Sequence, residues 1–82
     1  MYYINGDKYE GEYKNNEKNG KGIYYNKNGD RYEGDYKKDK REGQGIIYYN
    51  NGNREVGNYL NGNHIGNHVV IHPDQSITAV DY

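Results

Sequence analysis

The pentapeptide Tyr9-Glu10-Gly11-Glu12-Tyr13 recurs as Tyr32-Glu33-Gly34-Asp35-Tyr36, an offset of 23 residues, and this repetition decides the fold. The same offset leads to a degraded third copy in register, Glu55-Val56-Gly57-Asn58-Tyr59. No insertion or deletion separates the copies. The 82-residue chain therefore contains about three and a half copies of one unit, which is typical of stacked repeat proteins.

Each unit has the pattern of a β-hairpin. Residues 9–14 alternate Tyr or Gly with Glu or Lys, the period of a strand with two different faces. The next strand-forming run, Ile23-Tyr24-Tyr25, precedes Asn28-Gly29, a strong signal for a two-residue type I′ hairpin turn. The other connection, residues 15–21, is polar and longer. The sequence thus predicts an all-β fold: a single elongated, twisted antiparallel sheet of successive β-hairpin repeats.

A two-residue turn would also decide which side chains share a sheet face. It would place Tyr25 opposite Tyr32, and residues directly opposite share a face. One face would then carry a row of Tyr rings, with Gly and Ile between them. The rings expected to contact a partner are Tyr9, Tyr13, Tyr25, Tyr32, Tyr36, Tyr48 and Tyr59. The alternative is that these rings pack only on one another, as the core of the sheet.

The repeated unit, Tyr-Glu-Gly-Glu-Tyr followed by Gly-x-Gly-Ile and Asn-Gly-Asp-x-Tyr, resembles the MORN repeat. In copy one, the positions that match the family pattern are Tyr9, Gly11, Tyr13, Gly20 and Gly22. Copy three departs from the pattern at Glu55, which replaces the first Tyr, and at His68, which replaces a loop Gly. The resemblance covers about residues 2–72. It implies an elongated sheet of hairpins and an association with membrane-linked or cytoskeletal scaffolds.

Composition excludes several classes of protein. The chain has no Cys, so it can hold neither a disulfide framework nor a Cys-bearing zinc site. No apolar run approaches the ~18 residues of a membrane helix, and the N-terminus lacks a signal-peptide pattern. A cytoplasmic protein is therefore expected, with membrane or cytoskeleton association as the alternative. The net charge of -1 argues against nucleic acid as a partner.

Residues 69–82 are expected to form a closing hairpin with Pro73-Asp74 in its turn. Such a hairpin either caps the array or leaves an edge through which residues 60–82 pair with another subunit. Residues 1–82 are accordingly expected to form one repeat domain.

No catalytic, cofactor or metal site is expected. The carboxylates of Glu10, Glu12, Glu33 and Asp35 share a strand face with Lys14 and Lys37, which is typical of a solvated face. His64, His68 and His72 are spaced by four residues, with Asp74 nearby, but on strands and loops only His68 and His72 would share a face. All three are expected to be surface or edge histidines rather than metal ligands.

The sequence predicts a non-enzymatic protein-interaction or scaffolding module that binds a helix or an extended peptide along the Tyr/Gly face. A first alternative is a membrane adaptor that binds anionic phospholipids through Lys37, Lys38, Lys40 and Arg41. A second is an assembly subunit that forms homo-oligomers through its C-terminal edge.

Overall fold

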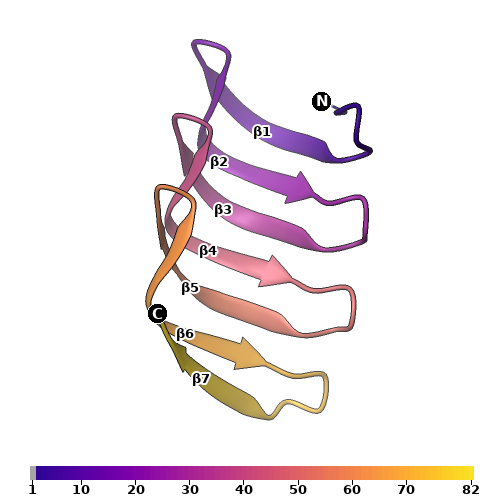
Figure 1. Cartoon of the computed structure of the whole chain (residues 1–82), viewed down its shortest axis with the longest axis vertical. Helices are drawn as coiled ribbons and strands as arrows, with labels where there is room; N and C mark the ends of the chain where they lie inside the picture. Colours follow the sequence, from indigo (N-terminus) through magenta and orange to yellow (C-terminus); the bar gives the residue numbers. More distant parts are fainter. Residues whose placement is uncertain (1) are drawn as a thin grey trace.

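The computed structural model describes residues 2–82, which form one open antiparallel sheet of seven strands and contain no helix (Figure 1). In chain order the strands are β1 (Lys8–Lys14), β2 (Glu17–Tyr25), β3 (Arg31–Lys37), β4 (Lys40–Tyr48), β5 (Arg54–Leu60), β6 (Asn63–Ile71) and β7 (Ile77–Asp81). Their order in the sheet is the same as in the chain. The predicted all-β sheet of successive hairpins is confirmed.

Tight turns occur where the sequence analysis expected the longer connection. Strands β1 and β2 pair up to Lys14 and Glu17, which leaves only Asn15 and Asn16 between them. Both have positive φ, 52° and 64°, as a type I′ turn requires. The equivalent turns are Lys38-Asp39 and Asn61-Gly62.

The turns at Asn-Gly are longer than predicted. Tyr25 pairs with Arg31, so residues 26–30 form the turn. Gly29 has φ of 100° and Asn28 is not left-handed, so this is not the type I′ turn that Asn28-Gly29 suggests. The amide of Asp30 instead donates to the Asn28 side-chain oxygen, at 3.0 Å.

The longer turn shifts the predicted register by one residue. Tyr24, rather than Tyr25, lies opposite Tyr32. Because successive side chains alternate between faces, a one-residue shift moves side chains to the other face. Tyr25 and Tyr48 therefore lie on the face opposite to Tyr32, and the prediction that all seven rings share one face is wrong at these two positions.

Each hairpin bends near its tip. Gly20, Gly43 and Gly66 occupy equivalent positions on β2, β4 and β6 and have positive φ of 85°, 76° and 68°. The pairing with the preceding strand is irregular beside them, which is typical of a β-bulge. The bent tips stack on one another: the Asp39 amide donates to the Lys18 carbonyl at 3.0 Å. Figure 1 shows the tips turned away from the plane of the strands.

The core lies on one face of the sheet, which we call the tyrosine face. It is defined by five residues that pair in succession across the strands: Tyr9, Tyr24, Tyr32, Ile47 and Glu55. The buried apolar side chains of the described residues are Tyr9, Tyr32, Tyr36, Ile47 and Tyr59. A single sheet thus obtains its core by packing rings against one another beneath the bent tips.

Candidate functional site

A continuous row of rings runs along the tyrosine face, across the repeats. The rings meet edge to face with centroid separations of 5.1 to 5.4 Å, in the order Tyr13, Tyr9, Tyr36, Tyr32, Tyr59 and His68. Edge-to-face contacts place the positive ring edge against the negative ring face and stabilise a pair beyond the area it buries. The row therefore couples each hairpin to the next.

Glycines make room for the rings. A Cβ atom on Gly22 would lie 2.2 Å from the Tyr9 hydroxyl oxygen, and one on Gly45 would lie 2.3 Å from the Tyr32 ring. The Tyr9 hydroxyl donates to the Glu12 carbonyl at 3.0 Å, and Tyr32 makes the same bond one repeat further on. Burial raises the pKa of Tyr32 to about 12. Each of these tyrosine rings thus occupies the space left by the missing side chain of a glycine, and its hydroxyl is hydrogen-bonded to a backbone carbonyl.

Cationic side chains lie over the rings at one repeated position. Lys18 Nζ is 5.6 Å from the centroid of the Tyr9 ring, and Arg41 Cζ is 4.8 Å from that of Tyr59. At such distances a cation is attracted to the negative ring face. His64 holds the equivalent position in copy three, and its ring centroid is 4.8 Å from that of Tyr59.

A groove of about 370 Å³ lies on the tyrosine face between the hairpin tips and Tyr24. Its lining includes Lys18, Tyr24, Tyr32, Tyr36, Asp39, Lys40 and Arg41. The Tyr24 hydroxyl donates to Asp7 at 2.8 Å, and burial together with this bond raises the pKa of Tyr24 to about 12. The groove therefore combines aromatic walls with a surplus of positive charge.

The structure separates the residues proposed for lipid binding. Lys37, Lys38 and Lys40 are exposed around the turn between β3 and β4. Arg41 is half-buried, and its guanidinium donates to the Gly62 carbonyl at 2.6 Å. Arg41 thus belongs to the ring row rather than to the exposed basic tip.

Several acidic residues of the first two repeats pair with neighbouring cations. Lys21 Nζ lies 2.9 Å from Asp35, and Arg31 lies 2.9 Å from Glu33. These pairs are at least partly solvent-exposed, where such contacts contribute little to stability.

Copy three exchanges the Tyr–Gly pair for a Glu–His pair, and His68 takes the place of the missing ring. The His68 side chain is 0% exposed and lies on β6, between β5 and β7, so the expectation of a surface or edge histidine is wrong for His68. Its ring lies 2.4 Å from where a Cβ of Gly57 would be, as the Tyr rings do over their glycines. His68 Nε2 lies 2.9 Å from the Asn58 carbonyl, the equivalent of the Glu12 carbonyl in copy one.

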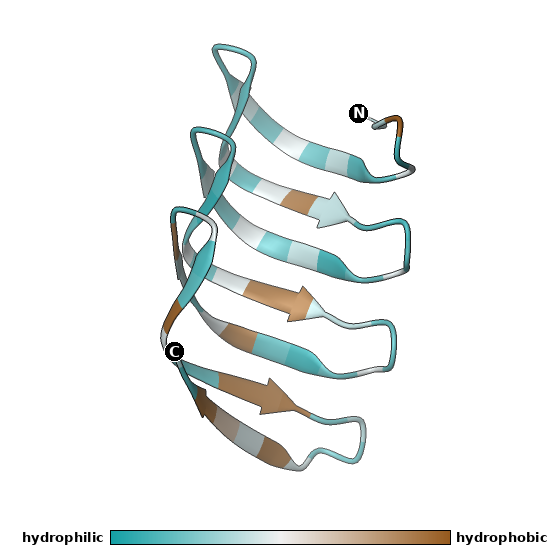
Figure 2. Cartoon of the chain, viewed as in Figure 1, coloured by the Kyte–Doolittle hydropathy of each residue, from teal (hydrophilic) through white to brown (hydrophobic). Residues whose placement is uncertain are grey.

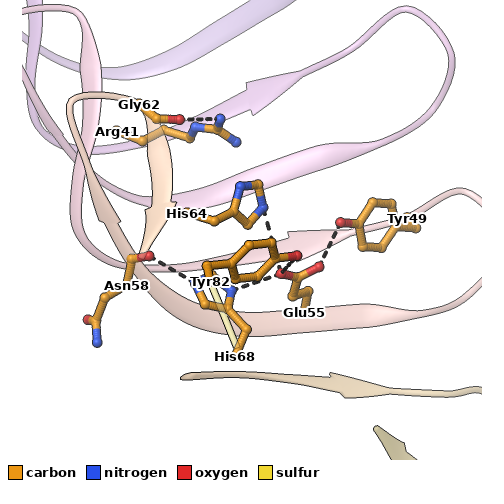
Figure 3. A network of polar contacts seen from close by, with 8 residues as sticks. All are labelled: Arg41, Tyr49, Glu55, Asn58, Gly62, His64, His68 and Tyr82. Atoms are coloured by element: carbon orange, nitrogen blue, oxygen red, sulfur yellow. Dashed lines mark hydrogen bonds and ion pairs between the residues drawn. The ribbon is translucent and has the colours of Figure 1, made fainter. Parts of the chain in front are cut away.

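The exchange places a buried carboxylate beside two imidazoles (Figure 3). The Glu55 side chain accepts hydrogen bonds from the hydroxyls of Tyr49 and Tyr82, both at 2.9 Å. Its Oε2 lies 2.8 Å from His68 Nδ1 and 3.6 Å from His64 Nε2. Burial lowers the pKa of His64, which favours the neutral ring.

Glu55, His64 and His68 could hold a metal ion, because each offers a ligand atom and these atoms all lie within 4.8 Å of one another. His72, which the sequence analysis grouped with His68, lies elsewhere, 2.7 Å from the Thr78 hydroxyl. The sequence contained one signal for the cluster. The two departures of copy three from the repeat, Glu55 and His68, fall on positions whose equivalents touch in the other copies.

An open sheet of bent hairpins with a ring and a glycine at fixed positions defines a hairpin-repeat protein. The MORN repeat family profile matches residues 9–31 and 32–54, which together make up 46 of the 82 residues. The chain therefore belongs to the MORN repeat family. No curated protein matches it.

MORN repeats are commonly protein- or membrane-interaction modules and are typically non-catalytic. Among the described residues, no helix is long and apolar enough to cross a membrane.

Proposed function

We propose that this chain is a non-enzymatic, cytoplasmic scaffolding module that binds an extended, acidic segment of a partner protein in the groove on the tyrosine face. The observation that carries the proposal is the groove itself, which places Lys18, Lys40 and Arg41 beside aromatic walls. Carboxylates of a bound segment would pair with these cations. Its apolar side chains would cover the partly exposed ring of Tyr24.

The groove is small, so we take its occupant to be an extended segment. A volume of about 370 Å³ has room for a few side chains, and an extended chain brings alternate side chains to one face. The rings of Tyr9, Tyr32, Tyr36 and Tyr59 are buried, so in this proposal they position the groove rather than touch the partner. Tyr13, 43% exposed, extends the aromatic surface at the β1 end. Tyr25 and Tyr48 face the other way and are left out of the proposal.

The test compares two neighbouring tyrosines on opposite faces. Peptides selected from a random displayed library would be labelled, and their affinity for the chain measured by fluorescence anisotropy. We expect Tyr24→Leu to weaken binding by about tenfold, within the range for an interface side chain, and Tyr25→Leu to leave it unchanged. Binding that depends on Tyr25, or on neither residue, would contradict the proposed surface.

Membrane binding is the second candidate, supported by the exposed tip residues Lys37, Lys38 and Lys40. Each basic residue near an anionic bilayer contributes about 1 kcal/mol, so three give only a weak, salt-sensitive affinity. Sedimentation with phosphatidylserine vesicles separates the two functions when only Lys37 and Lys38 are replaced by Gln. These two lysines lie outside the groove lining, so we expect the change to remove most of the lipid binding and to leave peptide binding in the groove intact.

Self-association is the third candidate. Strand β7 has a neighbour on one side only, and its first residue, Ile77, is 68% exposed. Figure 2 shows the hydrophobic colouring concentrated in the strands towards this end of the sheet. An open apolar edge can pair with another chain. Sedimentation velocity at increasing protein concentration would show a rising mass if residues 60–82 pair in this way.

A further inference from the structure

One buried nitrogen atom on the tyrosine face has no hydrogen bond. His68 Nδ1 is fully buried, and although Glu55 Oε2 lies only 2.8 Å away, the contact lacks hydrogen-bond geometry. Buried polar atoms in folded proteins are almost always satisfied, and an exception often marks the place of an ion. We propose that His68 Nδ1, His64 Nε2 and Glu55 Oε2 together bind one Zn²⁺ ion.

The spacing of the three atoms suits a tetrahedral ion. Bond lengths of ~2.0–2.2 Å to nitrogen and oxygen place neighbouring ligand atoms roughly 3.3–3.6 Å apart. The distance from Glu55 Oε2 to His64 Nε2, 3.6 Å, lies at the upper end of that range, and the distance to His68 Nδ1, 2.8 Å, lies below it. Two atoms that bind the same metal ion direct their lone pairs at the ion and not at each other. Two atoms that share a proton must instead be aligned, with the donor hydrogen pointing at the acceptor. The misaligned His68–Glu55 contact therefore favours a metal over a proton.

Surrounding groups orient two of the three ligands. The N–H at His68 Nε2 points to the Asn58 carbonyl at 2.9 Å, which leaves the lone pair at Nδ1 available. Tyr49 donates to the other oxygen of Glu55, so Oε2 remains directed at the imidazoles. Such supporting bonds are usual around metal ligands.

The C-terminal residue can complete the site. The Tyr82 hydroxyl is 2.9 Å from Glu55 Oε2, and its ring lies 4.7 Å from both His64 and His68 between centroids. This hydroxyl, or a water molecule held by it, would occupy the fourth position. The donor set of two imidazoles and one carboxylate is one that Zn²⁺ commonly takes in proteins. The ion would then link β5, β6 and the C-terminus at the end of the ring row.

The experiment is a titration of the whole chain, first stripped with EDTA, with ZnCl₂ by isothermal calorimetry. Melting temperatures are measured in parallel, and MgCl₂ serves as the metal control. We expect one Zn²⁺ per chain, a higher melting temperature with Zn²⁺ but not Mg²⁺, and a tetrahedral visible spectrum with Co²⁺. His64→Gln should weaken Zn²⁺ binding by at least about tenfold, as loss of even a supporting group does.

Two variants serve as matched controls. Glu55→Tyr/His68→Gly restores the Tyr–Gly pair of the first two repeats, so we expect it to fold and to lose the Zn²⁺ effect. His72→Asn removes a histidine outside the cluster and should bind Zn²⁺ normally. Absence of Zn²⁺ binding by the unmodified chain overturns the proposal. Equal binding by the double variant, or loss of binding in His72→Asn, overturns it as well.

Discussion

At the scale of single residues, a large side chain in this sheet depends on the glycine that it covers. Tyr32 occupies the space above Gly45, and His68 occupies the space above Gly57. Copy three has Glu55 and His68 where the other copies have Tyr and Gly. The His68 ring still covers a glycine, Gly57, and is still hydrogen-bonded to a backbone carbonyl. Neither residue can therefore be understood from its own position alone.

We expect this dependence to appear as strong coupling in a double-mutant cycle measured in EDTA. Glu55→Tyr alone brings a second ring into the slot held by His68, which should cost about 1–3 kcal/mol through overpacking. His68→Gly alone leaves a cavity and removes a neighbour of the Glu55 carboxylate. The double variant should be more stable than the sum of the single changes by about 1–3 kcal/mol. Urea unfolding followed by circular dichroism measures all four proteins, and additive effects would contradict the compensation.

The sequence alone could predict the ring row of copies one and two but not the cluster of copy three. Tyr9 and Tyr32 recur at the repeat offset, so their shared environment follows from the period. In the sequence, Glu55 and His68 are two unrelated departures from the repeat. Their relation becomes clear only when the equivalent residues, Tyr32 and Gly45, are known to be in contact. That contact depends on the register between β5 and β6, which no local pattern provides.

At the scale of elements, the turns hold neighbouring hairpins together. The Asp30 side chain accepts a hydrogen bond from the Asn50 amide of the next turn at 2.8 Å, as Asp7 does from the Lys27 amide. Both bonds join one turn to the next, so Asp7 and Asp30 link neighbouring hairpins.

We expect Asp30→Ala to lower the free energy of unfolding by about 1 kcal/mol, the usual net value for an intramolecular hydrogen bond, because this bond is exposed to solvent. Asp74 provides the control, because its carboxylate accepts hydrogen bonds from the amide and the hydroxyl of Ser76, within its own turn. Asp74→Ala should cost less than Asp30→Ala in the same thermal or urea unfolding measurement. The reverse order would show that bonding between turns is not what stabilises the array.

The position of the longer turns could be predicted from Asn28-Gly29, but their length could not. An Asn-Gly pair suits a type I′ turn, and it equally suits a wider turn in which only the glycine is left-handed. In the wider turn, the Asp30 side chain accepts a hydrogen bond from the next repeat. A rule based on the residues of one turn cannot predict such a contact between repeats. One misjudged turn then placed Tyr25 and Tyr48 on the wrong face.

At the scale of the whole molecule, the sheet has one layer, and tyrosine supplies most of its core. The fold class could be predicted because the strand and turn patterns recur every 23 residues. Where the pattern is unclear in one copy, the other copies still indicate it. A tyrosine core carries ionisable groups into the interior. Burial raises the pKa of Tyr32 to about 12, well above its ordinary value of 10.

We expect the protein to unfold cooperatively in alkali. A tyrosine whose pKa is raised by folding contributes its full stabilisation below pH 10 and loses it as the pH rises through its folded pKa, here about 12. For Tyr32 this loss amounts to about 2–3 kcal/mol. The near-ultraviolet absorbance of tyrosinate should rise together with the loss of strand signal in circular dichroism. Ionisation of all tyrosines near their ordinary pKa, with the sheet intact, would contradict a tyrosine core.

The pairing of each ring with a glycine also constrains how such arrays evolve. If a single mutation removes the ring, it leaves a void; if it enlarges the glycine, it creates a clash with the Tyr32 or Tyr9 ring. Divergence between copies must therefore cross a less stable intermediate or proceed by two linked changes. In the copy with Glu55 and His68 both positions differ together, and a carboxylate and an imidazole stand where the other two copies have a phenol ring and a glycine.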